Sequence, residues 1–248
     1  MFRSNKKYSY GKQNLDLKDY LAVFSTLKSP FLTCGPKVKE FEQSICDYTG
    51  AKYCVAVSNA TAGLHLAMLA LGIKEGDEVI TTPITFLSSA NCVRFVGGTV
   101  KFADIDPETA NINPVEIEKQ ITSKTKGIIP VHFAGQSCDM ERIYKIAKDN
   151  NLFVVEDAAH AIGSDYKDTK VGSCKYSDMT VFSFHPVKTI TTGEGGAVER
   201  SVIVARGQSV EVMAKGFEKI LRSFRRSWLW PGADAPASSR SPLRSRPG

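Results

Sequence analysis

The feature that most constrains the fold is a regular alternation, between residues 52 and 198, of short apolar runs with amphipathic helical patterns. Strands buried on both faces and separated by crossover helices specify a largely parallel, doubly wound sheet. The fold class predicted is therefore α/β, with helices on both faces of the sheet. The expected strands are Tyr53–Val57, Glu78–Thr81, Val100–Ala103, Gly127–Val131, Leu152–Val155, Val181–Phe184 and Gly196–Val198.

Helical spacing of apolar residues between these strands predicts the crossover helices. We expect them at Thr61–Leu71, at Ser88–Phe95, from Pro114 onward and at Met140–Lys148. Residues 1–50 form a separate N-terminal arm, with helices over Leu15–Leu27 and Lys37–Tyr48. The sequence thus divides into this arm, a main domain over residues 51–198, and a tail over residues 199–248.

The tail differs from the rest of the chain in charge and composition. Residues 1–198 carry 22 Lys and Arg against 22 Asp and Glu, whereas residues 199–248 carry 10 against 4 and account for the whole net charge of +6. The segment from Pro231 is rich in Pro, Ser and Arg, a composition typical of disorder. Because the main domain has no basic bias, nothing indicates a nucleic-acid-binding face.

Several classes of protein are disfavoured by what the sequence contains. No apolar run approaches membrane-spanning length, and the polar N-terminus lacks the apolar core of a signal peptide, so we expect a cytoplasmic protein without membrane contact. The six cysteines are scattered and predict reduced, mostly buried thiols. The four histidines have no metal-ligand spacing, so no metal is expected.

Two residues at the ends of expected strands carry the strongest chemical signal. Asp157 ends the apolar run that begins at Leu152, and Lys188 lies in the Gly- and Thr-rich segment 183–196. Functional groups in such sheets collect at the carboxyl ends of the strands. Pyridoxal phosphate chemistry requires a lysine that forms a Schiff base with the cofactor and a carboxylate that keeps the pyridine nitrogen protonated. The pair therefore predicts a pyridoxal phosphate site.

Glu156 and Asp157 are adjacent, so their side chains point to opposite faces of the strand. Only one of them can face a ligand beyond the strand end. The strand periodicity leaves both possibilities open.

Three further positions have a functional and a structural interpretation. The segment Ser58–Gly63 could hold a phosphate at a helix N-terminus, or Asn59 or Thr61 could simply cap that helix. Phe86 could stack on a cofactor ring or pack as a core aromatic. His160 could lie against the ring or orient Asp157, or be a buried histidine bonded to a backbone carbonyl.

Seven motifs follow one another along the chain. They are Gly35-Pro-Lys-Val-Lys-Glu-Phe-Glu42, Ser58-Asn-Ala-Thr-Ala-Gly63, Gly76-Asp-Glu-Val-Ile80, Ala103-Asp-Ile-Asp106, Pro130-Val-His-Phe-Ala-Gly135, Glu156-Asp-Ala-Ala-His-Ala-Ile-Gly163 and Ser183-Phe-His-Pro-Val-Lys188. In this order they resemble the motifs of the DegT/DnrJ/EryC1/StrS aminotransferases. The resemblance covers about residues 8–198 and implies the large domain of a fold-type-I, pyridoxal phosphate-dependent transferase, in a family whose intact members are homodimers.

The resemblance also implies roles for individual residues. Lys188 matches the catalytic Schiff-base lysine, and Asp157 matches the partner of the pyridine nitrogen. The other matched cofactor positions are Thr61 and Ala62 at the phosphate, Phe86 and His160 at the ring, and Ser183 near phosphate and substrate. The matched sugar-nucleotide positions are Tyr10, Pro30, Phe31, Leu32, Thr33, Ala60 and Ser183.

The activity implied is transfer of an amino group from L-glutamate to C4 of a UDP-linked 4-keto-6-deoxy sugar. The motifs are most similar to the branch of the family that serves pseudaminic acid biosynthesis, one of the pathways that supply surface polysaccharides. A family branch that dehydrates sugars carries histidine in place of the lysine, and Lys188 argues against it. A non-catalytic remnant that binds the cofactor, and a basic-tailed interaction protein, are the remaining alternatives.

The resemblance stops at Val198, where the Lys-rich composition also changes to an Arg-rich one. Family members continue into a smaller C-terminal domain, which we expect to be missing from this sequence. A frameshift or an aberrant gene end explains these features together. A chain of this kind would bind the cofactor without completing the catalytic cycle.

Overall fold

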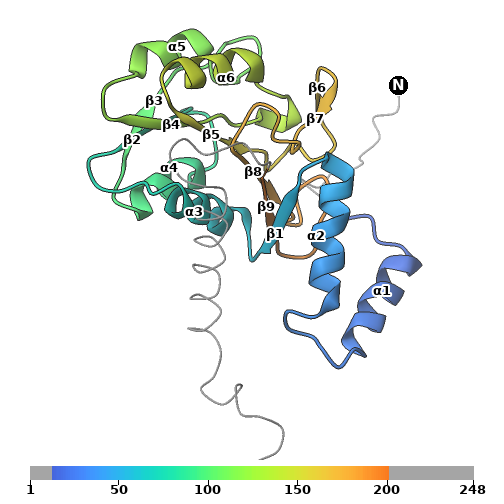
Figure 1. Cartoon of the computed structure of the whole chain (residues 1–248). Coiled ribbons are helices and arrows are strands. Elements are labelled where there is room, and N and C mark those ends of the chain that lie inside the picture. The colour runs from blue at the N-terminus through green and yellow to red at the C-terminus, as the bar shows by residue number, and fades with distance from the viewer. Residues whose placement is uncertain (1–12, 201–248) are drawn as a thin grey trace, which may run out of the picture.

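The fold is built on a seven-stranded sheet, with strand order β1-β9-β8-β5-β4-β2-β3. We analysed a computed structural model, which describes residues 13–200 (Figure 1). The strands of the sheet are β1 (Tyr53–Val57), β2 (Glu78–Thr81), β3 (Thr99–Phe102), β4 (Thr125–Ile129), β5 (Phe153–Asp157), β8 (Met179–Ser183) and β9 (Gly196–Arg200).

Five neighbouring strands are parallel, and one strand runs against its neighbours. The strands β3, β2, β4, β5 and β8 pair in parallel, whereas β9 pairs antiparallel with both β8 and β1. The expectation of a mostly parallel α/β sheet is confirmed. The β5 strand lies in the middle of the strand order, so residues at its carboxyl end are surrounded by the ends of other strands.

Helices cover both faces of the sheet. Successive side chains of a strand point to opposite faces, and in these strands both faces carry apolar side chains. Val79 and Val155 face one side, where they pack with α3 (Ala60–Ala70) and α4 (Ser88–Phe95). Ile80 and Val154 face the other side, where they pack with α5 (Pro114–Gln120) and α6 (Met140–Asp149). Figure 1 shows α5 and α6 above the sheet and α3 and α4 below it.

Three of these helices begin at residues whose side chains bind the first turn. Asn59 accepts from the backbone N–H of Ala62, Asn113 accepts from that of Val115, and Asp139 accepts from that of Arg142. Such caps satisfy N–H groups that have no partner inside the helix. The starts of α3, α5 and α6 are therefore fixed locally by the sequence.

The N-terminal arm contains α1 (Leu17–Leu27) and α2 (Pro36–Thr49), and the two helices differ in burial. The α2 helix packs through Ile45 against the sheet, whereas α1 has no buried residue. Figure 1 shows α1 as the element farthest from the sheet on that side. Within residues 13–200, no helix is both long and apolar enough to cross a membrane.

The structure corrects the expected elements at a few boundaries. The β9 strand continues through Glu199 and Arg200, although the sequence places the start of the tail at residue 199. The strand continues because its backbone still pairs with both neighbouring strands, where Glu199 lies opposite Thr180 on β8 and Cys54 on β1. A short hairpin, β6 (Asp165–Tyr166) and β7 (Thr169–Lys170), was not expected. Residues 201–248, which include the rest of the tail, lie outside the described part of the chain.

All six cysteines are free thiols, but the expectation that they are mostly buried holds for only three of them. Cys92, Cys138 and Cys174 are buried, while Cys34 is exposed and the other two are half-buried.

Glu199 is a buried carboxyl group with an incomplete set of partners. Its side chain is fully buried, and Oε1 lies 2.6 Å from the Thr49 hydroxyl. Its Oε2 has no hydrogen-bond partner among the described residues. The Thr49 hydroxyl also lies 2.9 Å from the carbonyl oxygen of Ile45, and its one proton can serve only one acceptor. Burial is the main cause that raises the pKa of Glu199 to about 8.

We expect the wild-type protein to lose stability as the pH rises, because Glu199 ionises, and we expect Glu199→Gln to lack this pH dependence. The folded-state pKa of Glu199, about 8, lies above the ordinary value of 4.5, so its contribution is complete below pH 4.5 and is lost progressively up to about pH 8. One pKa unit corresponds to about 1.4 kcal/mol, so the full loss is on the order of 5 kcal/mol. Denaturant unfolding of both proteins at pH 5 and pH 9 measures it.

The matched control is Glu194→Gln, because the side chain of Glu194 is 68% exposed. This variant should follow the wild-type protein at both pH values. Equal stability of Glu199→Gln and wild type at pH 9 would contradict the assignment of the loss to Glu199.

Candidate active site

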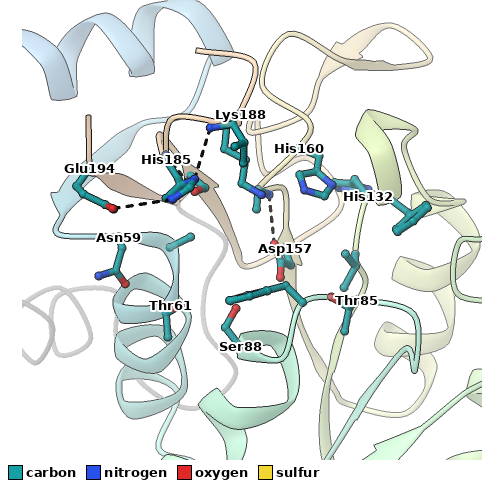
Figure 2. Close-up of a pocket in the computed structure, with 17 residues that line it drawn as sticks. Asn59, Thr61, Thr85, Ser88, His132, Asp157, His160, His185, Lys188 and Glu194 are labelled. Atoms are coloured by element: carbon teal, nitrogen blue, oxygen red, sulfur yellow. Dashed lines mark hydrogen bonds and ion pairs between the residues drawn. The ribbon is translucent and has the colours of Figure 1, made fainter. Parts of the chain in front are cut away.

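A cavity of about 730 Å³ opens at the carboxyl ends of β5 and β8 (Figure 2). It is bounded by the start of α3, by the segment that leads into α4, and by the loop that follows β8. Figure 2 shows Asp157 near its centre, with Asn59 and Thr61 on one side and His160 on the other. The lining residues are Asn59, Ala60, Thr61, Thr85, Phe86, Ser88, Val131, His132, Phe133, Asp157, Ala159, His160, Ser183, His185, Val187, Lys188 and Glu194.

Asp157 is the last residue of β5 and faces this cavity. Its side chain is 3% exposed. The Ser89 hydroxyl donates to Oδ2 at 2.6 Å, and the backbone N–H of Ala159 donates to Oδ1 at 3.2 Å. A buried carboxylate held by protein donors at the end of a strand can accept a further hydrogen bond from a ligand.

Glu156, the neighbour of Asp157, turns into the protein and contacts other side chains. The hydroxyls of Ser177 and Thr180 donate to Oε1, the latter at 2.8 Å. His132 Nδ1 accepts from the backbone N–H of Cys138, so Nε2 carries the proton and donates to Glu156 Oε2 at 2.7 Å. Burial raises the pKa of Glu156, but the donors outweigh it and hold that pKa below its ordinary value. Strand periodicity left open whether Glu156 or Asp157 faces a ligand, and the structure shows that Asp157 faces the cavity.

Lys188 lies on the loop between β8 and β9, with its side chain half-buried in the cavity wall. Its backbone N–H donates to the carbonyl of His185 at 2.9 Å, and the Thr191 hydroxyl donates to the carbonyl of Phe184 at the same distance. These bonds tie the loop to the end of β8. Burial lowers the pKa of the Lys188 amine, and the charge of Asp157 opposes that change only in part. A lysine with a lowered pKa has more neutral, nucleophilic amine at neutral pH.

His160 lies in the turn after β5 and lines the cavity with an exposed side chain. The interpretation of His160 as a buried structural histidine is therefore wrong. Partial burial and the charge of Lys188 lower the pKa of its imidazole, while Asp157 raises it. The neutral imidazole is favoured beside a cavity that also contains a lysine.

Phe86 is 73% exposed at the cavity, so its interpretation as a core aromatic is also wrong. The ring lies on the segment between β2 and α4, where it is available to a planar ligand. Stacking on such a ligand stays a prediction.

The start of α3 combines a helix cap with a close approach to the sheet. Asn59 caps the helix by accepting from the N–H of Ala62 at 2.9 Å, so the capping interpretation is confirmed for Asn59. A Cβ on Gly196 would lie 2.7 Å from the backbone nitrogen of Ala60, so only glycine allows this approach. Thr61 lines the cavity, whereas the N–H of Ala62 is already bonded. A phosphate at this helix start stays a prediction.

Only some of the expected sugar-nucleotide positions line the cavity. Ala60 and Ser183 line it. The segment 30–33 is exposed and does not belong to the lining. Tyr10 lies outside the described residues. The substrate roles of all these positions stay predictions.

Two hydroxyl residues near Asp157 were missed by the sequence reasoning. Ser89 bonds the carboxylate directly, and Thr85 lies 2.7 Å from the Ser89 hydroxyl. No sequence signal pairs them, because Thr85 precedes the helix that contains Ser89, which begins at Ser88. Nothing in the sequence indicates that β5 lies beside the first turn of that helix.

Comparison with known proteins gives consistent matches. The DegT/DnrJ/EryC1/StrS aminotransferase family model matches residues 14–201. The spore coat polysaccharide biosynthesis protein SpsC of Bacillus subtilis is 51% identical over 174 residues, which cover 70% of this chain and 44% of SpsC.

Two solved structures are similar in fold as well as in sequence. Spr1654 from Streptococcus pneumoniae, proposed to be a sugar aminotransferase and solved in its PLP form, has a TM-score of 0.78 and 34% identity, with 86% of this chain and 57% of that chain covered. PseC of Helicobacter pylori, an aminotransferase of pseudaminic acid biosynthesis, has a TM-score of 0.77 and 35% identity, with 88% and 56% covered. The chain thus spans about half the length of the proteins that it matches.

Proposed function

This chain belongs to the DegT/DnrJ/EryC1/StrS aminotransferase family, and we propose that its cavity binds pyridoxal 5′-phosphate covalently at Lys188. The observation that carries the proposal is the presence of Lys188 and the buried carboxylate of Asp157 in the wall of one cavity. Residues 51–198 would form the cofactor-binding domain. PLP dependence is a property of the family, and the solved PLP form of Spr1654 supports the same cofactor here.

The donor set of the cavity suits this cofactor. Asp157 offers an anionic acceptor for a ring N–H, and Lys188 offers an amine with a lowered pKa. Phe86 and His160 present a ring face and an imidazole at the same cavity. Thr61 at the start of α3 offers a hydroxyl and a helix N-terminus for a phosphate, which Ser183 would complete. Ala62 could contribute only if its N–H left the side chain of Asn59.

Each of these side chains has a definable part in amino transfer. When bound, pyridoxal phosphate supplies an electron-accepting ring that stabilises a carbanion next to the transferred nitrogen. Asp157 would offer a negative charge to the ring nitrogen and so favour a proton there. The amine of Lys188 would hold and move a proton at Nζ, first as base and then as acid. The neutral imidazole of His160 lies where it can contact the ring without adding positive charge.

For the substrates, we propose a UDP-linked 4-keto-6-deoxy sugar as acceptor and L-glutamate as donor. The support is the set of motifs shared with the pseudaminic acid branch, together with the fold similarity to PseC. SpsC, named for spore coat polysaccharide biosynthesis, points to the same broad class of pathway. Lys188 argues against the dehydratase branch. A cytoplasmic location stays part of this proposal.

We expect a chimera in which a family small domain follows residue 198, supplied with pyridoxal phosphate and L-glutamate, to convert a UDP-4-keto-6-deoxy sugar into its 4-amino product. Stoichiometric 2-oxoglutarate should appear, and both products can be measured by chromatography. The dTDP-linked counterpart, offered at the same concentration, is the matched control and should react more slowly. Equal or faster turnover of the dTDP sugar would contradict the proposed nucleotide preference.

We also propose that the working unit is a homodimer. The apolar side chains of α1 are 56–71% exposed, which is the kind of surface that a second protein chain covers. Sedimentation velocity measures the state directly, and a monomer at micromolar concentration would contradict it. The residues concerned are Leu17, Tyr20, Leu21, Val23, Phe24 and Leu27.

A further inference from the structure

The carboxylate of Asp157 is held by one protein donor on each oxygen. The backbone N–H of Ala159 donates to Oδ1, and the Ser89 hydroxyl donates to Oδ2. A carboxylate has about four acceptor positions, so these two bonds leave capacity for a donor in the cavity. Glu156 differs, because three side-chain donors surround it and it is absent from the cavity lining.

The hydrogen-bond geometry gives the direction in which the hydroxyl protons point. The Ser89 oxygen lies 2.6 Å from Asp157 Oδ2, 2.7 Å from the Thr85 hydroxyl and 3.2 Å from the carbonyl oxygen of Phe86. Its one proton goes to the charged and nearest acceptor, at a distance typical of a charge-assisted O–H···O⁻ bond. Ser89 then accepts from Thr85, which lines the cavity. A chain of donors therefore runs from Thr85 through Ser89 to Asp157.

We propose that Ser89 is a positioning residue that keeps the carboxylate of Asp157 aimed at the ring nitrogen of the cofactor. The proposal rests on the proposed function, because it assigns Ser89 a part in holding pyridoxal phosphate. The bond from the Ser89 hydroxyl restricts rotation of the Asp157 side chain, and it joins the first turn of α4 to the end of β5, 68 residues away.

Ser89 is suited to this part because it is fully buried. Water cannot replace a hydroxyl that is removed from a position without access to solvent. Ser89→Ala therefore leaves Oδ2 of Asp157 without its donor. A carboxylate in that state is a poorer and less well oriented partner for a protonated ring nitrogen.

The test compares the affinity of the full chain for pyridoxal phosphate with its affinity for an analogue in which C–H replaces the ring nitrogen. Absorbance titration gives both constants. Wild type should prefer pyridoxal phosphate. We expect Ser89→Ala to weaken pyridoxal phosphate binding by about tenfold, the effect of one charge-assisted hydrogen bond, and to leave analogue binding nearly unchanged.

Ser177→Ala is the matched control. It removes the same kind of hydroxyl from the neighbouring carboxylate, Glu156, which is equally buried but faces away from the cavity. This variant should lose stability and keep the wild-type preference for pyridoxal phosphate over the analogue. A purely structural role for Ser89 would make both serine variants alike, with both ligands weakened equally or neither affected.

Thr85→Val gives a second measurement if Ser89→Ala does not fold. It removes the first link of the chain and keeps Ser89 in place, so the preference should fall by only about two- to threefold. An unchanged preference in the folded variants would overturn the role of Ser89 while wild type still binds the cofactor. Failure of wild type to bind pyridoxal phosphate would overturn the proposed function, and with it this inference.

Discussion

Lys188→Ala is expected to abolish covalent capture of pyridoxal phosphate and, in the chimera with a family small domain, to reduce amino transfer by on the order of 10⁴-fold, because one side chain supplies both the nucleophile and the base. Borohydride reduction of wild type with pyridoxal phosphate, followed by peptide mapping, should place the pyridoxyl group on Lys188. The same treatment of Lys188→Ala should give no label. Label on another lysine of the wild-type protein would refute the assignment.

Two further variants separate the chemistry of this lysine from its charge. Lys188→Arg keeps a positive charge but has no amine that can lose its proton near neutral pH, so it should be as inactive as Lys188→Ala. Lys145→Ala removes a lysine whose side chain is 77% exposed and should leave labelling unchanged.

The pH dependence of capture follows from the lowered pKa of Lys188. Only the neutral amine attacks, so the rate should rise with pH and level off once the amine has lost its proton. Because burial lowers this pKa, the midpoint should fall below the ordinary lysine value of 10.5. A midpoint at or above that value would contradict the burial seen in the structure.

Asp157→Asn is expected to leave the fold intact and, in the chimera with a family small domain, to reduce amino transfer by on the order of 10³-fold. Asparagine has nearly the same shape, and its amide oxygen can still accept from Ser89 or Ala159. It has no negative charge, however, and cannot keep the ring nitrogen of the cofactor protonated. Circular dichroism checks the fold, and steady-state kinetics measure the loss. Near-normal turnover would show that another group holds the ring nitrogen.

Glu156→Gln is the control for this experiment. It neutralises a carboxylate on the same strand that is turned toward His132, Ser177 and Thr180. We expect a loss of stability of about 1–3 kcal/mol, because a buried network is disturbed, with turnover per folded molecule close to wild type. The reverse pattern in the two variants would exchange the roles of Glu156 and Asp157.

Much of the fold could be predicted because its signals are local. Alternating apolar runs gave the strands and their helical connections, and Asn59, Asn113 and Asp139 mark where three helices begin. The same locality explains why Lys188 and Asp157 could be selected as a pair. Both follow a strand in a sheet whose parallel strands end at one edge, so their proximity follows from the topology.

The neighbours of those strands could not be predicted, because pairing is decided by packing between segments distant in the sequence. The β9 strand lies between β1 and β8 and runs antiparallel to both. That placement buries Glu199 in a position that its local sequence does not indicate. It also brings Gly196 against the start of α3, where a larger residue would not fit.

By itself the sequence determined the α/β class, the positions of most elements and the residue types needed for the chemistry, because each depends on periodicity or on the end of a strand. Only the tertiary structure decided that Asp157 rather than Glu156 faces the cavity. A period of two assigns neighbours to opposite faces but does not say which face holds the ligand. The packing of α4 beside β5 makes that choice, by bringing Ser89 to Asp157 and leaving Glu156 among donors inside the protein.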